Sequence, residues 1–169
     1  MSGLNAEVIE CLAVKEYYRD AQTFQVPAMT GRAGATATVG YVNTGADTNL
    51  VTLAQSATAD TWVVPLNLHE GDVITSLGLS GQIESSGNAV TVDYELRATT
   101  AVATGSTDAS IQAGTQIAKS ADYLIADSTA LATAHTVTSG ESIYVLITCT
   151  TAATTDVELQ YVEVTINQR

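Results

Sequence analysis

The segment His69-Glu70-Gly71-Asp72 places three side chains that could bind a metal or transfer protons within four residues. A zinc site needs three or four converging ligands, with His or Cys preferred. The other histidine of the chain is His135, and no H-E-x-x-H spacing is present. A Gly-Asp pair is typical of a turn that exposes the polar side chains beside it. We therefore interpret this segment as a polar connection between two strands, and we predict no metal site here.

Two further features could suggest nucleophilic chemistry. The segment Gly78-Leu79-Ser80-Gly81 lacks the G-x-S-x-G spacing of a nucleophile elbow, and no helical pattern follows it. We place Ser80 on the outer face of a strand, where it and Gly78 allow a neighbouring strand to approach closely. Cys149 lies in the most apolar strand and is predicted to be a buried, inert thiol, as free thiols are also the default for Cys11. We expect no catalytic residue and no cofactor.

Four aspartates could supply oxygen ligands to calcium. They are assigned to loops at Asp47, Asp108, Asp127 and Asp156. A calcium site needs several oxygen ligands, and the chain has no D-x-D-x-D-G loop. We therefore predict no bound metal.

The aromatic residues could form a platform on which sugar rings stack, because carbohydrate-binding β-sandwich modules often expose such side chains. The candidates are Trp62, Tyr41, Tyr94, Tyr123, Tyr144 and Tyr161. Most of them alternate with Val, Ile or Leu on the side that we assign to the core, so core packing is favoured. An exposed Trp62 or a row of outward tyrosines would instead favour sugar binding.

The pattern of apolar residues predicts strands. Residues 88–99 alternate strictly, with Val90, Val92, Tyr94 and Leu96 on one side, which indicates one buried face. Residues 141–150 are apolar on both sides, typical of a central strand covered on both faces. In residues 156–166 the phase changes between Tyr161 and Val162, as a β-bulge would cause. With the weaker strands, such as 122–126 and 131–138, these segments predict an all-β, antiparallel, jelly-roll-like sandwich of about eight strands.

The first 33 residues differ in composition from the rest. They hold three of the six cations and both methionines, whereas residues 34–169 are rich in Thr, Ala, Val and Gly. We divide the chain into an N-terminal arm, residues 1–33, and a sandwich domain, residues 34–169. The pattern of residues 5–20 fits a helix or a strand. Because the arm is too short to form a hydrophobic core of its own, we predict that it contacts another subunit or a shell protein. The expected interface residues are Val8, Leu12, Tyr17, Tyr18 and Phe24.

The charge of the chain excludes several partners. The formal net charge is -12, and the six cations are scattered rather than gathered in a stripe. Binding to nucleic acid or to an anionic membrane is therefore not expected. There is no apolar run of about 18 residues that could span a membrane, and the N-terminal residues lack the pattern of a signal peptide. We expect synthesis in a cytoplasm without secretion by a signal peptide.

Three stretches together resemble β-sandwich structural proteins of tailed bacteriophages. These are "TWVVPLNLHEGDVITSLGLSGQI", the long alternating strand after it, and "HTVTSGESIYVLITCTTAATTDVELQYVEVTI", over about residues 60–167. The resemblance implies a non-enzymatic virion protein, with a capsid decoration (cement) protein favoured over a fibre-type protein. Its partners would be other copies of itself, a trimer being favoured, and the major capsid protein. The alternative is a carbohydrate-binding or adhesin-like module of a phage fibre or of an enzyme.

Overall fold

The structure of the chain is a computed structural model that describes residues 21–34, 39–42, 50–54, 59–85, 87–151 and 155–167. These residues form twelve strands and one short 3-10 helix, with no α-helix among them. The elements are β1 (Ala21–Pro27), η1 (Ala28–Thr30), β2 (Arg32–Ala33), β3 (Val39–Val42), β4 (Leu50–Ala54), β5 (Asp60–Pro65), β6 (Val73–Ser85), β7 (Val90–Val102), β8 (Gly105–Ala113), β9 (Ile117–Lys119), β10 (Tyr123–Thr136), β11 (Glu141–Thr150) and β12 (Thr155–Asn167).

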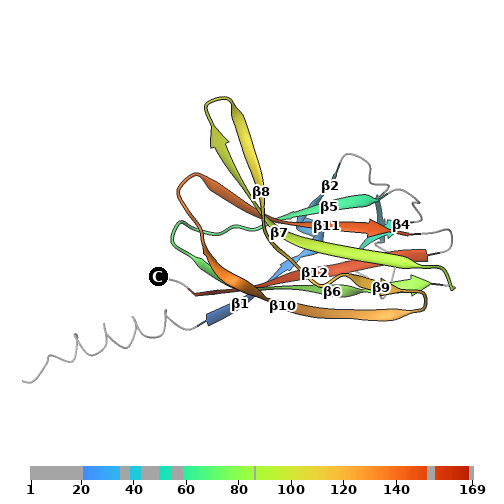
Figure 1. The fold of residues 1–169 in the computed structure, drawn as a ribbon. Helices are drawn as coiled ribbons and strands as arrows, with labels where there is room; N and C mark the ends of the chain where they lie inside the picture. The colour runs from blue at the N-terminus through green and yellow to red at the C-terminus, as the bar shows by residue number, and fades with distance from the viewer. Residues whose placement is uncertain are drawn as a thin grey trace, which may run out of the picture.

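The strands form two sheets that lie face to face (Figure 1). Sheet A has the order β10-β6-β12-β4-β3, and β1 pairs with β12 on the same edge as β4. Sheet B has the order β2-β5-β11-β7-β8, and β9 pairs with β7 beside β8. Every pairing is antiparallel. The predicted antiparallel β-sandwich is therefore confirmed.

The core lies between the sheets and is built from the alternating residues of the long strands. In sheet B, the inward side chains of β7 and β11 are buried, as the alternation predicts; they are Val90, Val92, Tyr94, Leu96, Ile143, Val145 and Ile147. The inward residues of β12 in sheet A are buried as well; they are Val157, Leu159, Val162, Val164 and Ile166. Burial of these apolar side chains provides the main stabilisation of the two layers.

The change of phase in β12 is a β-bulge. The pairing of β12 with β6 shifts between Leu159 and Tyr161, and the residue between them, Gln160, is exposed. The extra residue returns Val162 to the inner face after Leu159. The predicted bulge is confirmed.

Several polar strands differ from the prediction. Residues 122–126 and 131–138 were expected as two strands, but β10 is one 14-residue strand whose pairing with β6 is interrupted between Ala130 and His135. Asp108, Asp127 and Asp156 lie in β8, β10 and β12, so their assignment to loops was wrong. β8 is mostly exposed on both faces, and the partly buried side of β10 includes Asp127 and Thr129, so neither strand shows the apolar alternation that identifies a strand from sequence. Asp47 lies outside the described residues.

The second half of the predicted arm is built into both sheets. β1 pairs with β12 over its whole length, and Arg32 and Ala33 of β2 pair with β5. Phe24 lies on β1 and is 39% exposed. Residues 1–20 lie outside the described residues, and with them Val8, Leu12, Tyr17 and Tyr18. The boundary at residue 33 and the role of the arm in contacts between subunits stay predictions.

A half-buried carboxylate, that of Glu141, closes the turn between β10 and β11. Glu141 accepts a hydrogen bond from the backbone N–H of Thr138 at 2.9 Å, and its Oε2 lies 3.1 Å from Nε2 of His135. The predicted structural role of His135 fits this contact. Burial tends to raise the pKa of Glu141, but the hydrogen bonds from Thr138 and His135 outweigh burial and lower the pKa.

We expect Glu141→Gln to lower the free energy of unfolding by ~1–2 kcal/mol at pH 7, because a charged hydrogen bond is lost. A carboxylate whose pKa is lower in the folded state stabilises it above the unfolded pKa, and this contribution is lost as pH falls through the folded pKa. The difference between the two proteins should therefore be present at pH 7 and shrink at pH values below the usual range of a glutamate pKa, about pH 4. Urea unfolding at pH 7 and at low pH measures it. Glu70→Gln, in an exposed turn, is the control, and an equal difference at both pH values would contradict the assignment.

Candidate functional site

The segment His69-Glu70-Gly71-Asp72 is a turn that leads from β5 in sheet B to β6 in sheet A. The backbone N–H of His69 donates to the Asp72 carboxylate at 2.8 Å, and the N–H of Asp72 donates to the carbonyl of His69 at 3.1 Å. Gly71 has φ +93°, a conformation that favours glycine. The predicted turn is confirmed. Within the part of the chain that the structure describes, no three His, Cys, Asp or Glu side chains gather in a way that could hold a metal.

Ser80 and Gly78 lie where the strands of sheet A approach closely. The Ser80 hydroxyl donates to the side-chain oxygen of Gln160 on β12 at 3.3 Å. A Cβ atom at Gly78 would lie 2.8 Å from the carbonyl oxygen of Asp127 on β10. The predicted close approach of a neighbouring strand is confirmed. Cys149 is free and buried, and burial raises the pKa of its thiol, so the thiol stays protonated. Cys11 lies outside the described residues.

The aromatic residues divide between the core and the surface. Trp62 and Tyr94 are buried, as predicted. Burial and a hydrogen bond from its hydroxyl to Asp127 raise the pKa of Tyr94 to about 12. Core packing was the wrong prediction for the other described tyrosine side chains, since Tyr123 is exposed and Tyr144 and Tyr161 are half-buried. Of these three, Tyr144 lines a hollow on sheet B.

This hollow is a cleft of about 570 Å³ on the outer face of sheet B, which we call the sheet B cleft. Figure 1 shows the β7–β8 hairpin rising from the sheet. Thr99 and Asp108, which pair across this hairpin, border one side of the cleft, and Thr30 and Arg32 from η1 and β2 border it as well. The other lining residues are Val63, Pro65, Ser142, Ile143, Tyr144 and Leu146. The cleft therefore joins apolar side chains of β5 and β11 to polar and charged side chains from other segments.

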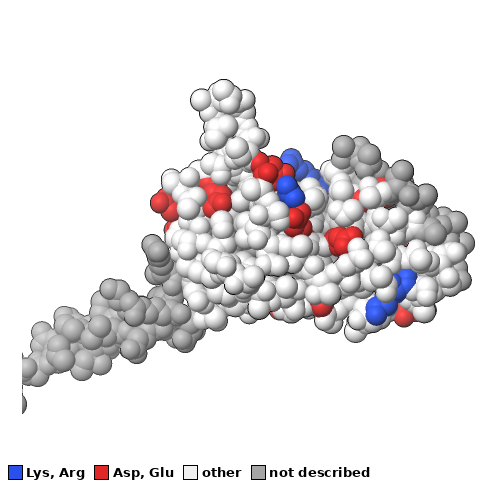
Figure 2. Space-filling model, viewed as in Figure 1, with Lys and Arg blue, Asp and Glu red and all other residues white. Residues whose placement is uncertain are grey.

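A network of hydrogen-bonded charged side chains lies on the side of the cleft next to the β7–β8 hairpin. Arg97 contacts Glu95 at 2.6 Å through Nη1 and Asp108 at 3.2 Å through both Nε and Nη2. The Tyr144 hydroxyl donates to Asp108 at 2.7 Å and accepts from Nε of Arg97 at 3.2 Å. In Figure 2, acidic and basic side chains lie together at the base of the protruding hairpin. Because both ends of the network are anchored on strands, the Tyr144 side chain is held in a fixed position.

The network fixes the charge states of its members. The hydrogen bonds from the Tyr144 hydroxyl and from Arg97 lower the pKa of Asp108. Burial and the hydrogen bond to Asp108 raise the pKa of Tyr144, and the hydrogen bonds to Asp108 and Glu95 raise the pKa of Arg97. At neutral pH the cleft therefore presents the neutral phenol of Tyr144, and the guanidinium of Arg97 behind it is hydrogen-bonded to two carboxylates.

The sequence interpretation missed this cleft. Residues 141–150 were expected to be covered on both faces, but only the inner side chains of β11 are buried, and Tyr144 and Leu146 remain half-buried on the outer face. The available signal was the large apolar side chains on the outward positions of β11 and β5, including Val63. Polar residues are usual at outward positions of an antiparallel sheet. None of the described cleft residues was among the predicted interface residues.

Comparisons with known proteins concern the fold. No model of a protein family matches the chain, and no curated protein matches its sequence. Among solved structures, the CBM22-1 xylan-binding domain of Paenibacillus barcinonensis Xyn10C is similar, with a TM-score of 0.50 and 11% identity over 89% of this chain and 96% of that domain. The C-terminal family 22 carbohydrate binding module of Clostridium thermocellum Xyn10B gives a TM-score of 0.47 and 10% identity over 83% of this chain and 91% of that module. At these identities the likeness shows the β-sandwich fold alone.

Proposed function

We propose that the chain is a non-catalytic binding module that holds a polysaccharide in the sheet B cleft. The observation that carries this proposal is the combination of an apolar floor, which includes Tyr144 and Leu146, with polar side chains at its borders. The C–H faces of sugar rings pack on aromatic and apolar side chains, while their hydroxyl groups bond to the polar groups around them. The fixed hydrogen bonds of Tyr144 mean that little ordering is required when a ligand binds.

The electrostatics of the cleft favour an uncharged glycan. Asp108 and Arg32 line the cleft with charges of opposite sign, Glu95 lies next to Asp108 and Arg97, and the chain carries a formal net charge of -12. An anionic polysaccharide would be repelled at long range, and the guanidinium of Arg97 is already hydrogen-bonded to two carboxylates. An uncharged polysaccharide, such as a neutral xylan or a glucan, avoids this repulsion.

The fold likeness supports the proposal without determining the ligand. The Paenibacillus domain, described as xylan-binding, shares the sandwich architecture at a TM-score of 0.50. A β-sandwich of this size can therefore serve as a glycan-binding module, and soluble xylan is the first ligand to test. The absence of catalytic activity is part of the same proposal.

We expect Tyr144→Ala to weaken binding of a neutral soluble polysaccharide at least about tenfold, because the variant removes ring contact and releases Asp108 and Arg97 from their hydroxyl partner. Affinity electrophoresis with xylan and with neutral glucans, followed by calorimetry on any ligand found, measures the effect. Tyr161→Ala is the matched control, since Tyr161 is also half-buried but lies on sheet A.

Thermal unfolding of both variants separates a loss of binding from a loss of fold. Equal affinities of the Tyr144→Ala variant and the unsubstituted protein would contradict the assignment of the cleft. Absence of binding to every neutral polysaccharide tested would contradict the proposed function itself.

A structural role in a bacteriophage particle is a second candidate function. It is favoured by an apolar groove beside β1, described below, because exposed apolar surfaces of this kind serve assembly. In such a particle the chain would be a fibre or decoration component that contacts copies of itself and a shell protein. Negative-stain micrographs of the purified full chain test this role: closed rings or fibres would support it, and isolated monomers would contradict it.

A further inference from the structure

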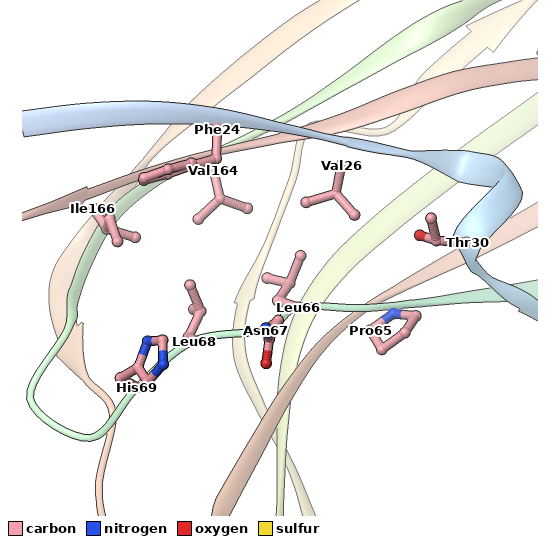
Figure 3. Close-up of a pocket in the computed structure, with 10 residues that line it drawn as sticks. All are labelled: Phe24, Val26, Thr30, Pro65, Leu66, Asn67, Leu68, His69, Val164 and Ile166. Atoms are coloured by element: carbon pink, nitrogen blue, oxygen red, sulfur yellow. The ribbon is translucent and has the colours of Figure 1, made fainter.

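A second hollow, which shares only Thr30 and Pro65 with the sheet B cleft, lies at the edge of the sandwich near β1. It is a groove of about 400 Å³ between β1 and β12 on one side and the connection from β5 to β6 on the other, and we call it the β1 groove. Figure 3 shows Phe24 and Val26 of β1 pointing toward Leu66 and Leu68 across the groove. The remaining lining residues are Thr30, Pro65, Asn67, His69, Val164 and Ile166.

The β1 groove is suited to apolar side chains. Its walls are mainly aliphatic, and His69, the one titratable residue that lines it, has a side chain that is 86% exposed. Phe24 is 39% exposed although it is a large apolar residue. An open apolar groove of this kind is costly in water and gains free energy when another apolar surface covers it.

The position at which the N-terminal residues join the sandwich identifies an occupant. Ala21, the first residue of β1, pairs with Asn167, so residue 20 attaches beside the end of the groove that Ile166 lines. The twenty residues before β1 contain apolar side chains at Leu4, Val8, Ile9, Leu12 and Val14. A chain of this length can reach up to about 3.3 Å per residue, which is enough to reach a neighbouring copy.

The direction of β1 favours the groove of another copy over the groove of the same chain. β1 runs along its groove from Ala21, so a segment that entered the same groove would have to fold back tightly just before Ala21. Among the residues that favour tight reversals, glycine and proline do not occur between Gly3 and Pro27, and Asp20 alone stands next to Ala21. A segment that continues away from Ala21 can reach a neighbouring copy without such a reversal. We propose that the β1 groove takes residues 1–20 of a second copy of this chain, and that each copy donates one segment and receives one in a closed oligomer.

Cross-linking of the full chain tests whether residues 1–20 of the same copy or of a second copy occupy the β1 groove. A photo-crosslinking amino acid replaces Ile9, and this protein is mixed with an equal amount of ¹⁵N-labelled protein without it. The expected result is cross-links from position 9 to peptides of the labelled copy that contain Phe24 or Leu68. Cross-links confined to the same copy, or cross-links that avoid these peptides, would overturn the proposal.

Substitutions test whether the contact holds the oligomer together. Leu12→Asp in the donated segment and Leu68→Asp in the groove should each weaken association at least about tenfold in sedimentation velocity, because each places a charge in an apolar contact. Leu124→Asp is the matched control, because Leu124 is 72% exposed on β10 and away from the groove. An oligomer unaffected by Leu12→Asp, or a monomeric unsubstituted chain, would overturn the proposal. If Leu68→Asp does not fold, the cross-linking pattern decides.

Discussion

Trp62→Ala is expected to lower the free energy of unfolding by ~3–5 kcal/mol. The Trp62 side chain on β5 is fully buried, and its indole Nε1–H donates a hydrogen bond to the carbonyl of Ala28 at 2.8 Å. Removing it leaves a large cavity and a carbonyl in η1 without this donor. Because the hydrogen bond ties η1 to sheet B, the loss should also loosen the residues that border the sheet B cleft at Thr30.

The control for this prediction is Trp62→Phe, which keeps much of the buried area but removes the indole N–H. It should cost less than Trp62→Ala, and the remaining loss reflects the hydrogen bond to Ala28 together with the smaller volume. Chemical denaturation with fluorescence-independent detection, such as circular dichroism, measures both variants. A loss below about 1 kcal/mol for Trp62→Ala would show that the indole is not packed in the core.

Leu96→Ala is expected to cost ~2–5 kcal/mol of the free energy of unfolding. Leu96 is fully buried on β7, opposite Val145 of the neighbouring β11. The side chain faces the interior at the centre of sheet B, where the surrounding strands cannot collapse fully into the space that alanine leaves.

Thr91→Ala, on the outward side of the same strand, provides the matched control, because Thr91 is half-buried and not part of the core. It should change stability by no more than about 0.5 kcal/mol. Similar costs at Leu96 and Thr91 would contradict the assignment of the Leu96 side of β7 to the core.

The sequence predicted the fold where one face of a strand is buried and the other is not. The alternation in β7 identified its inward residues, and the phase change in β12 identified a bulge that the structure contains. It failed for β8, because both faces of this strand are largely exposed, and for β10, because its partly buried side carries Asp127 and Thr129 beside Ile125. A sequence pattern can reveal a strand only where burial imposes it.

The sheet B cleft was not predictable in the same way. Among its borders, Arg32 lies far in the sequence from Thr99 and Asp108, and these residues meet because β2 and the β7–β8 hairpin belong to the same sheet. The outward position of Arg97 followed from the alternation, but its bonds to Glu95, Asp108 and Tyr144 depend on tertiary structure. The apolar outward face of β11 was visible in the sequence and was wrongly interpreted as a buried face.

The resemblance to phage structural proteins and the carbohydrate-binding alternative lead to compatible proposals. A glycan-binding module can be part of a fibre, where the sheet B cleft would face the ligand and the β1 groove would serve assembly. The two surfaces share only Thr30 and Pro65 among their lining residues. Loss of one activity should therefore leave the other intact, which allows each proposal to be tested separately.

Binding of a neutral glycan in the sheet B cleft is the proposal on which the function of this chain rests. The most direct test is a titration of the ¹⁵N-labelled full chain with neutral oligosaccharides, including xylohexaose. The backbone amide chemical shifts are measured by NMR at each step of the titration. We expect shifts that saturate and that concentrate at cleft residues such as Val63, Thr99 and Leu146. The amides of Tyr161 and Glu163 on sheet A should remain unchanged. Shifts confined to sheet A, or no shifts with any neutral oligosaccharide, would contradict the claim.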